Sequence, residues 1–241
     1  MDMKVTNVGY KTDIGRVRKN NEDRLHVDEK IGLFIVADGM GGHQSGEVAS
    51  AMAVDIISSE IAKTLERNNI PVIIHKSIEK ANREIYNKAN KDINLNGMGT
   101  TVVLSLCHED KIYIAHVGDS KAYLIRDGAI IQLTQDHSLV AELLKAGEIT
   151  EEDVRRHHLR HVVTKVLGSK EFAEPDIMTI SPQDGDYFLL CTDGLTEMVR
   201  DEEIRDAIIN VCEPQKICEE LICLANKNGG KDNISVILIA V

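Results

Sequence analysis

Four aspartates stand where an apolar stretch of the chain begins or ends, which is where a rigid scaffold commonly presents functional groups. They are Asp38 after the run 33–37, Asp119 after Val117-Gly118, Asp193 after Leu190-Cys191-Thr192, and Asp232 before the run from Ile234. Any one of them could instead be a simple turn residue, because Asp-Gly is a strong turn dipeptide. Asp127-Gly128 lies between two alternating strands and Asp184-Gly185 in a polar stretch, so we interpret both as surface turns and as internal controls.

Three of these aspartates differ from the two turn pairs in having small or flexible residues beside them. The segments are Asp38-Gly-Met-Gly-Gly, Thr192-Asp193-Gly and Gly229-Gly-Lys-Asp232-Asn, and we interpret them as loops whose backbone comes close to something bound. Oxygen ligands without any His or Cys metal spacing favour hard cations such as Mg²⁺ or Mn²⁺ over zinc. A pair of such ions can hold a bridging hydroxide for in-line attack on a phosphate ester. The alternative is that the acids are exposed and unrelated.

The segment 12–23 adds two candidates. Acids and basic residues alternate there with few apolar ones, so packing in a core does not explain its composition. Arg18 can bind phosphate oxygens through paired N–H groups, and Asp23 can orient a metal-bound water. We therefore expect Arg18 and Asp23 to serve one site.

The apolar pattern predicts the elements that must position these residues. Apolar runs predict strands, and apolar residues at three- and four-residue spacing predict helices. The expected order is a strand at 33–37, helices at 49–65 and 74–89, an antiparallel meander of strands at 100–107, 112–117, 122–126 and 129–133, a strand at 187–191, helices at 202–211 and 215–227, and an internal strand at 234–241. Helix pairs that must cover sheets imply stacked sheets with helical layers outside.

Composition narrows the class of protein. The chain has 241 residues, 43% of them hydrophobic, and a formal net charge of −11, so we expect a packed core, one compact domain and no nucleic-acid partner. Five scattered cysteines are an odd number, which favours reduced thiols packed in the core over disulfides or a zinc site. No apolar run approaches the length of a membrane span. We therefore expect a cytoplasmic protein without a membrane partner.

Seven motifs in one order resemble a known family. They are Asp13-Ile-Gly-x-x-Arg18-x-x-Asn21-Glu-Asp23, Val36-Ala-Asp38-Gly-Met-Gly-Gly-His43, Gly99-Thr-Thr, Val117-Gly-Asp119-Ser, Leu133-Thr-x-Asp-His137-Ser, Thr192-Asp193-Gly-Leu and Lys231-Asp232-Asn-x-Ser. Together they are similar to the metal-dependent serine/threonine protein phosphatases, the type 2C group or PPM family, in its compact bacterial form. One motif alone is weak evidence, whereas seven in the same order over nearly the whole chain are specific.

The resemblance implies a fold and an activity. The fold would be α+β, with two stacked antiparallel sheets between pairs of antiparallel helices, in a single catalytic domain over residues 1–241 with a flap at about 138–168. The activity would be metal-dependent hydrolysis of phosphoserine and phosphothreonine in proteins by a metal-bridging hydroxide, without a phosphoenzyme. The enzyme would be a monomer opposing a serine/threonine kinase whose phosphorylated substrates it shares. Two alternatives remain, a catalytically silent binding module and a phosphatase of small phosphate esters.

The resemblance also implies roles at matching positions. Two Mn²⁺ or Mg²⁺ ions would occupy the core site, and a third, weaker ion would lie beside it. The implied residues are Asp38, the Gly39 carbonyl, Asp193 and Asp232 for the core ions, Asp119 with Asp193 for the third ion, Glu22 and Asp23 for metal-bound waters, Arg18 for the substrate phosphate, and Asn233 as a supporting residue behind the ligands.

The proton donor to the leaving group is open. The better-known eukaryotic pattern has a histidine after the Asp-Gly pair, where this chain has Met40. His43 is the candidate in this chain, but it could instead cap the helix that we expect to begin near Ser45, and a metal-bound water could donate the proton.

A basic cluster, 155–161, falls within the expected flap. It reads Arg-Arg-His-His-Leu-Arg-His in an acidic protein. It is either a solvated helix face or a docking surface for acidic phosphoprotein substrates.

Overall fold

Two antiparallel sheets form the centre of the protein. The computed structural model describes residues 5, 7–41, 45–65, 69–211 and 213–241. The five-stranded sheet has the order β1 (Asn7–Asp13), β11 (Ile234–Ala240), β10 (Tyr187–Cys191), β7 (Lys121–Arg126) and β8 (Ala129–Gln132). The other has the order β2 (Asp23–Asp28), β3 (Leu33–Met40), β5 (Val102–His108), β6 (Lys111–Val117) and β9 (Asp176–Ile180), with β4 (Gly99–Thr100) paired to β3.

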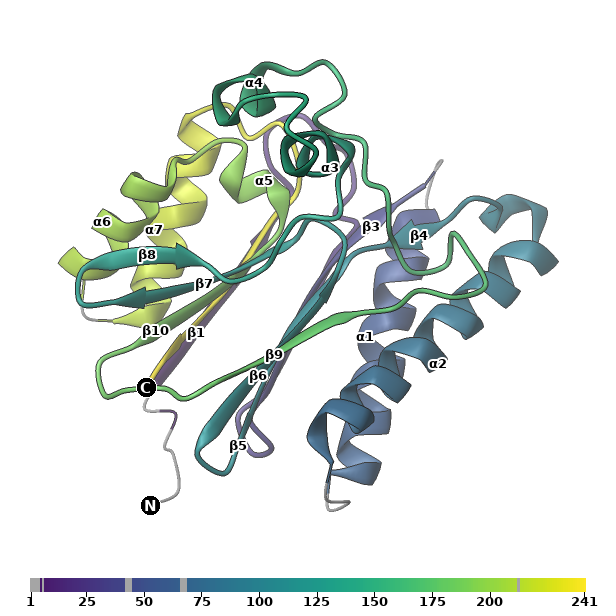
Figure 1. The fold of residues 1–241 in the computed structure, drawn as a ribbon, viewed down its shortest axis with the longest axis horizontal. Coiled ribbons are helices and arrows are strands. Elements are labelled where there is room, and N and C mark those ends of the chain that lie inside the picture. Colours follow the sequence, from purple (N-terminus) through teal and green to yellow (C-terminus); the bar gives the residue numbers. More distant parts are fainter. Residues whose placement is uncertain (1–4, 6, 42–44, 66–68, 212) are drawn as a thin grey trace.

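Helices cover the outer face of each sheet (Figure 1). The pair α1 (Ser45–Thr64) and α2 (Ile70–Lys91) packs on the six-stranded sheet, and a short 3₁₀ turn (Ile93–Leu95) follows it. The pair α6 (Asp201–Asn210) and α7 (Pro214–Lys227), with the short α5 (Asp193–Thr196), packs on the five-stranded sheet. The predicted α+β fold of stacked sheets between helix pairs is confirmed, and none of the described helices is long and apolar enough to cross a bilayer.

Strand β3 shows why the sequences of the central strands are continuous apolar runs. Leu33, Ile35 and Ala37 face the helices of their own layer, whereas Phe34 and Val36 face the other sheet. Alternate side chains leave opposite faces of a strand, so a strand between two cores needs apolar residues at every position. β11 is buried along its whole length for the same reason, and its predicted internal place, between β1 and β10, is confirmed.

The expected meander is wrong at its centre. Strands β5 and β6 form a hairpin in one sheet and β7 and β8 a hairpin in the other, so the chain changes sheet between Val117 and Lys121. Gly118 makes the crossing with φ of +111°, and a Cβ there would lie 2.6 Å from the Thr101 side chain. Four strands of similar length with short turns do not reveal in sequence which turn closes a hairpin and which crosses between layers.

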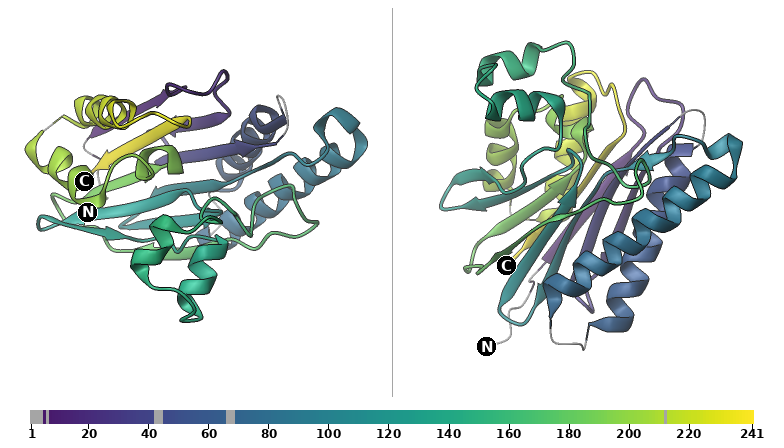
Figure 2. Two further views of the ribbon diagram at one scale, coloured as in Figure 1. Left: turned by 90° about the horizontal axis from the view of Figure 1, so that it is seen from above. Right: turned by 45° about the vertical axis from the view of Figure 1, so that its right-hand side comes forward.

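The segment predicted as a flap lies at one end of the sandwich, beyond the ends of several strands (Figures 1 and 2). It holds α3 (Leu139–Lys145), capped by Ser138, and α4 (Glu151–Arg156), which begins with a capping box at Thr150. The polar stretch between 136 and 176 predicts no helix or strand, but the structure has both helices there, and β9 starts at Asp176. That the segment moves as a flap stays a prediction.

Candidate active site

The candidate acids converge from both sheets. Asp38 lies two residues before the end of β3, opposite Asp23, the first residue of β2, in the antiparallel register. Asp193 begins α5 directly after β10, Asp232 precedes β11, and Asp119 lies on the crossing between the sheets. One cavity of about 430 Å³ is lined by Asp38, Gly39, Asp119, Asp193 and Asp232, and by Arg18, Glu22 and Asn233. Asp23 is buried, with 2% of its surface exposed, and is the one described candidate that does not line this cavity.

Asn233 ties the loop that carries Arg18 to the start of β11. Its side-chain amide donates to the carbonyl oxygens of Ile14, at 3.0 Å, and Asn20, at 2.9 Å. Its side-chain oxygen accepts from the backbone N–H of Glu22, at 2.8 Å. A buried side chain with three such bonds fixes the loop between β1 and β2 against the segment that carries Asp232.

The glycines after two of the acids allow backbone segments to meet. A Cβ at Gly39 would lie 2.1 Å from the Gly46 carbonyl oxygen, and one at Gly194 would lie 1.9 Å from the Asn233 carbonyl oxygen. Neither glycine has a positive φ. Here the close approach that sequence analysis assigned to a bound group is made by the protein's own backbone, which brings the acids together.

Burial and mutual repulsion dominate the electrostatics of the acids. Burial raises the pKa of Asp38 and of Asp193 well above the usual range of a carboxyl, and the neighbouring carboxylates raise it further. Burial likewise raises the pKa of Asp119, and it raises the pKa of Asp23 to about 7 against the hydrogen bonds from Ser235 and Thr192. Such a cluster favours a positive counter-charge.

The donor set fits a divalent cation. Among the described residues, Asp23 Oδ1 and Asp193 Oδ1 are buried and have no hydrogen-bond partner. Buried carboxylate oxygens rarely stay unpaired, so two of them within one group of acids indicate a missing partner. The candidate ligands here are all oxygens, which suits Mg²⁺ or Mn²⁺.

Arg18 is the basic residue bound within this group of acids. Its Nη2 donates to Asp232 Oδ2 at 2.6 Å, and this bond, more than any other contact, raises the pKa of the guanidinium. Half of the Arg18 side chain is exposed and it lines the cavity, and a guanidinium has five N–H donors. Asp232 can therefore orient Arg18 while other N–H groups bind an anion.

Four hydroxyl residues support the acids, and sequence analysis gave them no role. Thr100 Oγ1 donates to the Asp38 carbonyl oxygen at 2.8 Å, and the Asp38 N–H donates to Thr101 Oγ1 at 3.0 Å. Thr101 Oγ1 and Ser120 Oγ are 2.6 Å apart, and Thr192 Oγ1 donates to Asp23 Oδ2 at 3.0 Å. Ser120 and Thr192 directly adjoin a candidate acid in the sequence, whereas Thr100 and Thr101 are marked only by the Gly99-Thr-Thr motif.

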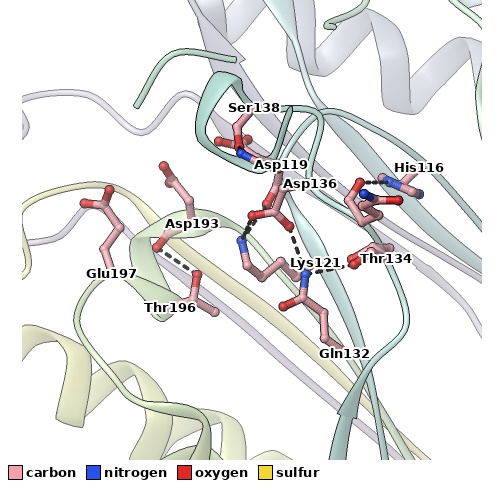
Figure 3. A network of polar contacts seen from close by, with 12 residues as sticks. His116, Asp119, Lys121, Gln132, Thr134, Asp136, Ser138, Asp193, Thr196 and Glu197 are labelled. Carbon is pink, nitrogen blue, oxygen red and sulfur yellow. Dashed lines mark hydrogen bonds and ion pairs between the residues drawn. The ribbon is translucent and has the colours of Figure 1, made fainter. Parts of the chain in front are cut away.

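The basic cluster 155–161 reaches the cavity with two of its residues, Arg160 and His161. His161 Nδ1 lies 2.7 Å from Glu197 Oε1, which joins the predicted flap to the end of α5. Beside this contact a larger groove of about 1120 Å³ extends past Lys121 toward α6. Asp119, Asp193 and Glu197, labelled in Figure 3, line both the groove and the cavity. Met40 also lines the cavity, whereas His43 lies outside the described residues.

Comparison with known proteins places this architecture in a family. Residues 15–226 match the family described as protein phosphatase 2C. The chain belongs to that family. It is 41% identical to the serine/threonine phosphatase Stp of Listeria innocua over 236 residues, covering 95% of this chain and 94% of the other. It is 40% identical to the protein phosphatase PhpP of Streptococcus pneumoniae, covering 95% of each chain.

Solved structures of serine/threonine phosphatases superpose over nearly the whole chain. The serine/threonine phosphatase of S. agalactiae has a TM-score of 0.91 at 39% identity, covering 98% of this chain and 99% of the other. The catalytic domain of the phosphatase PstP in complex with two manganese ions has a TM-score of 0.87 at 32% identity, covering 98% of each chain. The predicted family is confirmed, and it is a metal-dependent one.

Proposed function

We propose that this protein phosphatase 2C domain hydrolyses phosphoserine and phosphothreonine monoesters in proteins with two Mn²⁺ or Mg²⁺ ions in its core site and a third, weaker ion beside it. The observation that carries the proposal is the gathering of buried and half-buried carboxylates from both sheets around one cavity that an arginine also lines. The names of the relatives, serine/threonine phosphatase and protein phosphatase, support the same substrate class.

The cavity supplies the ligands for such ions. Asp38, Asp193, Asp232 and the Gly39 carbonyl would hold the core pair, and Asp119 would hold the third ion together with Asp193. When bound, divalent cations polarise phosphoryl oxygens and lower the pKa of water, so that it attacks phosphorus at neutral pH.

The chain's own residues position the phosphate and the water. Arg18, held by Asp232, would bind the phosphate oxygens with its remaining N–H groups. Asp23, held by Thr192 behind the cavity, and Glu22, at its wall, would accept hydrogen bonds from waters on the ions and so fix their orientation. Asn233 keeps Arg18 and Glu22 in place through the loop that it ties down.

A protein substrate suits the surroundings of the site. Arg160 and Lys231 line both the cavity and the adjoining groove, so these two side chains offer positive charge to a phosphorylated polypeptide that enters the cavity from the groove. We propose that the enzyme acts as a cytoplasmic monomer on phosphoproteins made by a serine/threonine kinase. The proton donor is left to His43 or to a metal-bound water.

The test is turnover of a phosphothreonine peptide by the purified protein in Mn²⁺ and then in EDTA, beside p-nitrophenyl phosphate. We expect phosphate release from the peptide in Mn²⁺ and none in EDTA, with a higher kcat/KM for the peptide than for the small ester. No turnover of either substrate would indicate a silent binding module. A preference for the small ester would replace the protein substrate with a small-molecule one.

A further inference from the structure

His137 joins the base of the predicted flap to the turn that carries Asp119. It follows β8 and directly precedes Ser138, the cap of α3. Its backbone N–H donates to the Gly118 carbonyl oxygen at 2.9 Å, and its Nδ1 accepts from the Gly118 N–H at 3.1 Å. One residue thus satisfies both backbone groups of Gly118, which immediately precedes Asp119.

The bond to Gly118 determines the protonation of the His137 ring. Because Nδ1 accepts from an N–H, the neutral ring must carry its proton on Nε2. Nε2 lies 3.4 Å from Asp176 Oδ2, which can accept that proton's hydrogen bond. Burial, followed by nearby His116 and Lys165, lowers the pKa of His137 against the opposing effect of Asp176, which favours the neutral ring.

A metal site is the competing interpretation of this cluster. His116, His137 and Asp176 have potential ligand atoms within 4.8 Å of one another. However, Nδ1 of His137 already accepts a hydrogen bond and Nε2 must carry the proton, so neither nitrogen has a free lone pair for a cation. The two imidazole rings are also stacked, with centroids 4.7 Å apart and planes 14° from parallel, so one cation cannot lie in the plane of both. The cluster is organised for hydrogen bonding.

Further contacts make the turn and the flap base one unit. Lys121 Nζ donates to the Asp119 carbonyl oxygen at 3.2 Å and to Asp136 Oδ2 at 2.6 Å, and Figure 3 shows this lysine reaching Asp136 beside Asp119. On the flap side, the His137 carbonyl oxygen accepts from the Thr164 N–H at 2.8 Å. His137 is therefore bonded to the Asp119 turn on one side and to the returning end of the flap segment on the other.

We infer that His137 is a positioning residue, which holds the Asp119 turn in place through the Gly118 N–H···Nδ1 hydrogen bond and fastens it to the base of the flap segment. The inference rests on the proposed function, because that function gives Asp119 its role. It adds a residue from the motif 133–138, to which the proposed function assigns nothing. Its ring acts through Gly118 and does not line the cavity.

Two amide substitutions distinguish the roles of the two ring nitrogens of His137. His137→Asn places an acceptor near the position of Nδ1 and removes the contact to Asp176, whereas His137→Gln places its polar atoms near Nε2 and loses the bond to Gly118. We expect His137→Gln to lower kcat and raise the Mn²⁺ concentration for half-maximal activity about 10-fold or more, as for loss of a residue that orients a metal ligand, with KM for phosphopeptide nearly unchanged. His137→Asn should stay within about threefold of the parent in both.

Two controls match these variants. Asp176→Asn removes the charge near Nε2 and leaves the Gly118 bond, and His108→Asn makes the same histidine-to-asparagine change at the last residue of β5. Both should retain the kcat and the Mn²⁺ response of the parent. Equal losses in His137→Asn and His137→Gln, or a loss in Asp176→Asn as large as that in His137→Gln, would overturn the inference.

Nitrogen NMR of the metal-free protein tests the same bond without any turnover. With ¹⁵N-labelled histidine and glycine, His137 should show an unprotonated Nδ1 and a protonated Nε2 at neutral pH, with a scalar coupling between Nδ1 and the Gly118 nitrogen. A protonated Nδ1 would overturn the inference. Because this readout needs no substrate, an inactive protein with the expected tautomer would refute the proposed function and leave the hydrogen bond established.

Discussion

The Asp-Gly pairs of this chain are of two physical kinds. In the turns, Gly128 and Gly185 have φ of +76° and +89°, and a Cβ on either would meet nothing within 4 Å. In the site, Gly39 and Gly194 lack a positive φ, but a Cβ on either would collide with the backbone of another segment. The turn glycines serve conformation and the site glycines serve close approach, so the same dipeptide has two unrelated reasons to contain glycine.

The difference shows how the site is assembled. At the hairpin, Asp127 and Gly128 both have positive φ and connect neighbouring strands of one sheet. At the site, Gly194 lets α5 close on the Asn233 backbone, so Asp193 and Asp232 come together across the end of the five-stranded sheet. Close approach of segments far apart in the sequence is what gathers the carboxylates.

The largest contrast should appear between Asp193→Asn and Asp127→Asn. The first removes a charged ligand from the proposed cation site, so we expect kcat/KM for phosphopeptide to fall at least about 100-fold. The second changes an exposed turn residue and should stay within about threefold. The measurement is steady-state kinetics in saturating Mn²⁺, and equal losses would remove the distinction between site and hairpin.

The glycines give the next contrast. Gly194→Ala should lower the free energy of unfolding by about 3 kcal/mol or more, because the new Cβ must displace the Asn233 backbone. Gly128→Ala should cost only about 1 to 2 kcal/mol, from the left-handed conformation alone, and leave activity intact. Urea unfolding of both variants checks this, and a larger cost at Gly128 would mean that close approach is not the constraint at Gly194.

Mn²⁺ should stabilise the site and leave the hairpin unaffected. Selective binding to the native state adds about 2.7 kcal/mol at a hundredfold excess over Kd. Thermal melts in Mn²⁺ and in EDTA should therefore differ clearly for the parent and for Asp127→Asn, and by much less for Asp193→Asn. An unchanged melt of the parent in millimolar Mn²⁺ would contradict the cation site.

The last contrast is the effect of pH on the metal-free protein. Asp23 has a folded pKa of about 7, above its usual value near 4, so between these values the folded state binds more protons than the unfolded state. The free energy of unfolding in EDTA should therefore fall as pH rises from 4 to 7, by at most about 1.4 kcal/mol per pH unit for such a carboxyl. Melts at pH 5 and 7.5 measure it, and a higher melting temperature at pH 7.5 in EDTA would oppose the assignment of buried carboxylates.

Much of the fold could be predicted because its signals are local. The helices α1, α2, α6 and α7 follow from apolar spacing, and the buried strands β3, β10 and β11 follow from short apolar runs. The pairing of the strands was predicted wrongly, because nothing in the sequence between Val117 and Lys121 shows that the chain changes sheet there. The short helices α3 and α4 lack a long apolar stripe and depend on their caps, Ser138 and Thr150.

The candidate site was predictable as a set of residues and less so as a geometry. Strand ends and flexible neighbours singled out Asp38, Asp193 and Asp232, and the resemblance supplied their roles, which stay predictions. Sequence could not reveal the Arg18–Asp232 contact or the three bonds of Asn233, because both join segments more than 200 residues apart.

The position of β11 has a consequence for how the protein is made. This strand lies between β1 and β10, so β1 stays without its neighbour in the five-stranded sheet until residues 234–240 have been synthesised. Asp232 and Asn233, which directly precede β11, arrive at the same moment. A ribosome-bound chain that lacks this strand therefore has neither a closed sheet nor a complete set of carboxylates. The proposed site can therefore form only after the chain has been made through residue 240 and β11 has inserted between β1 and β10.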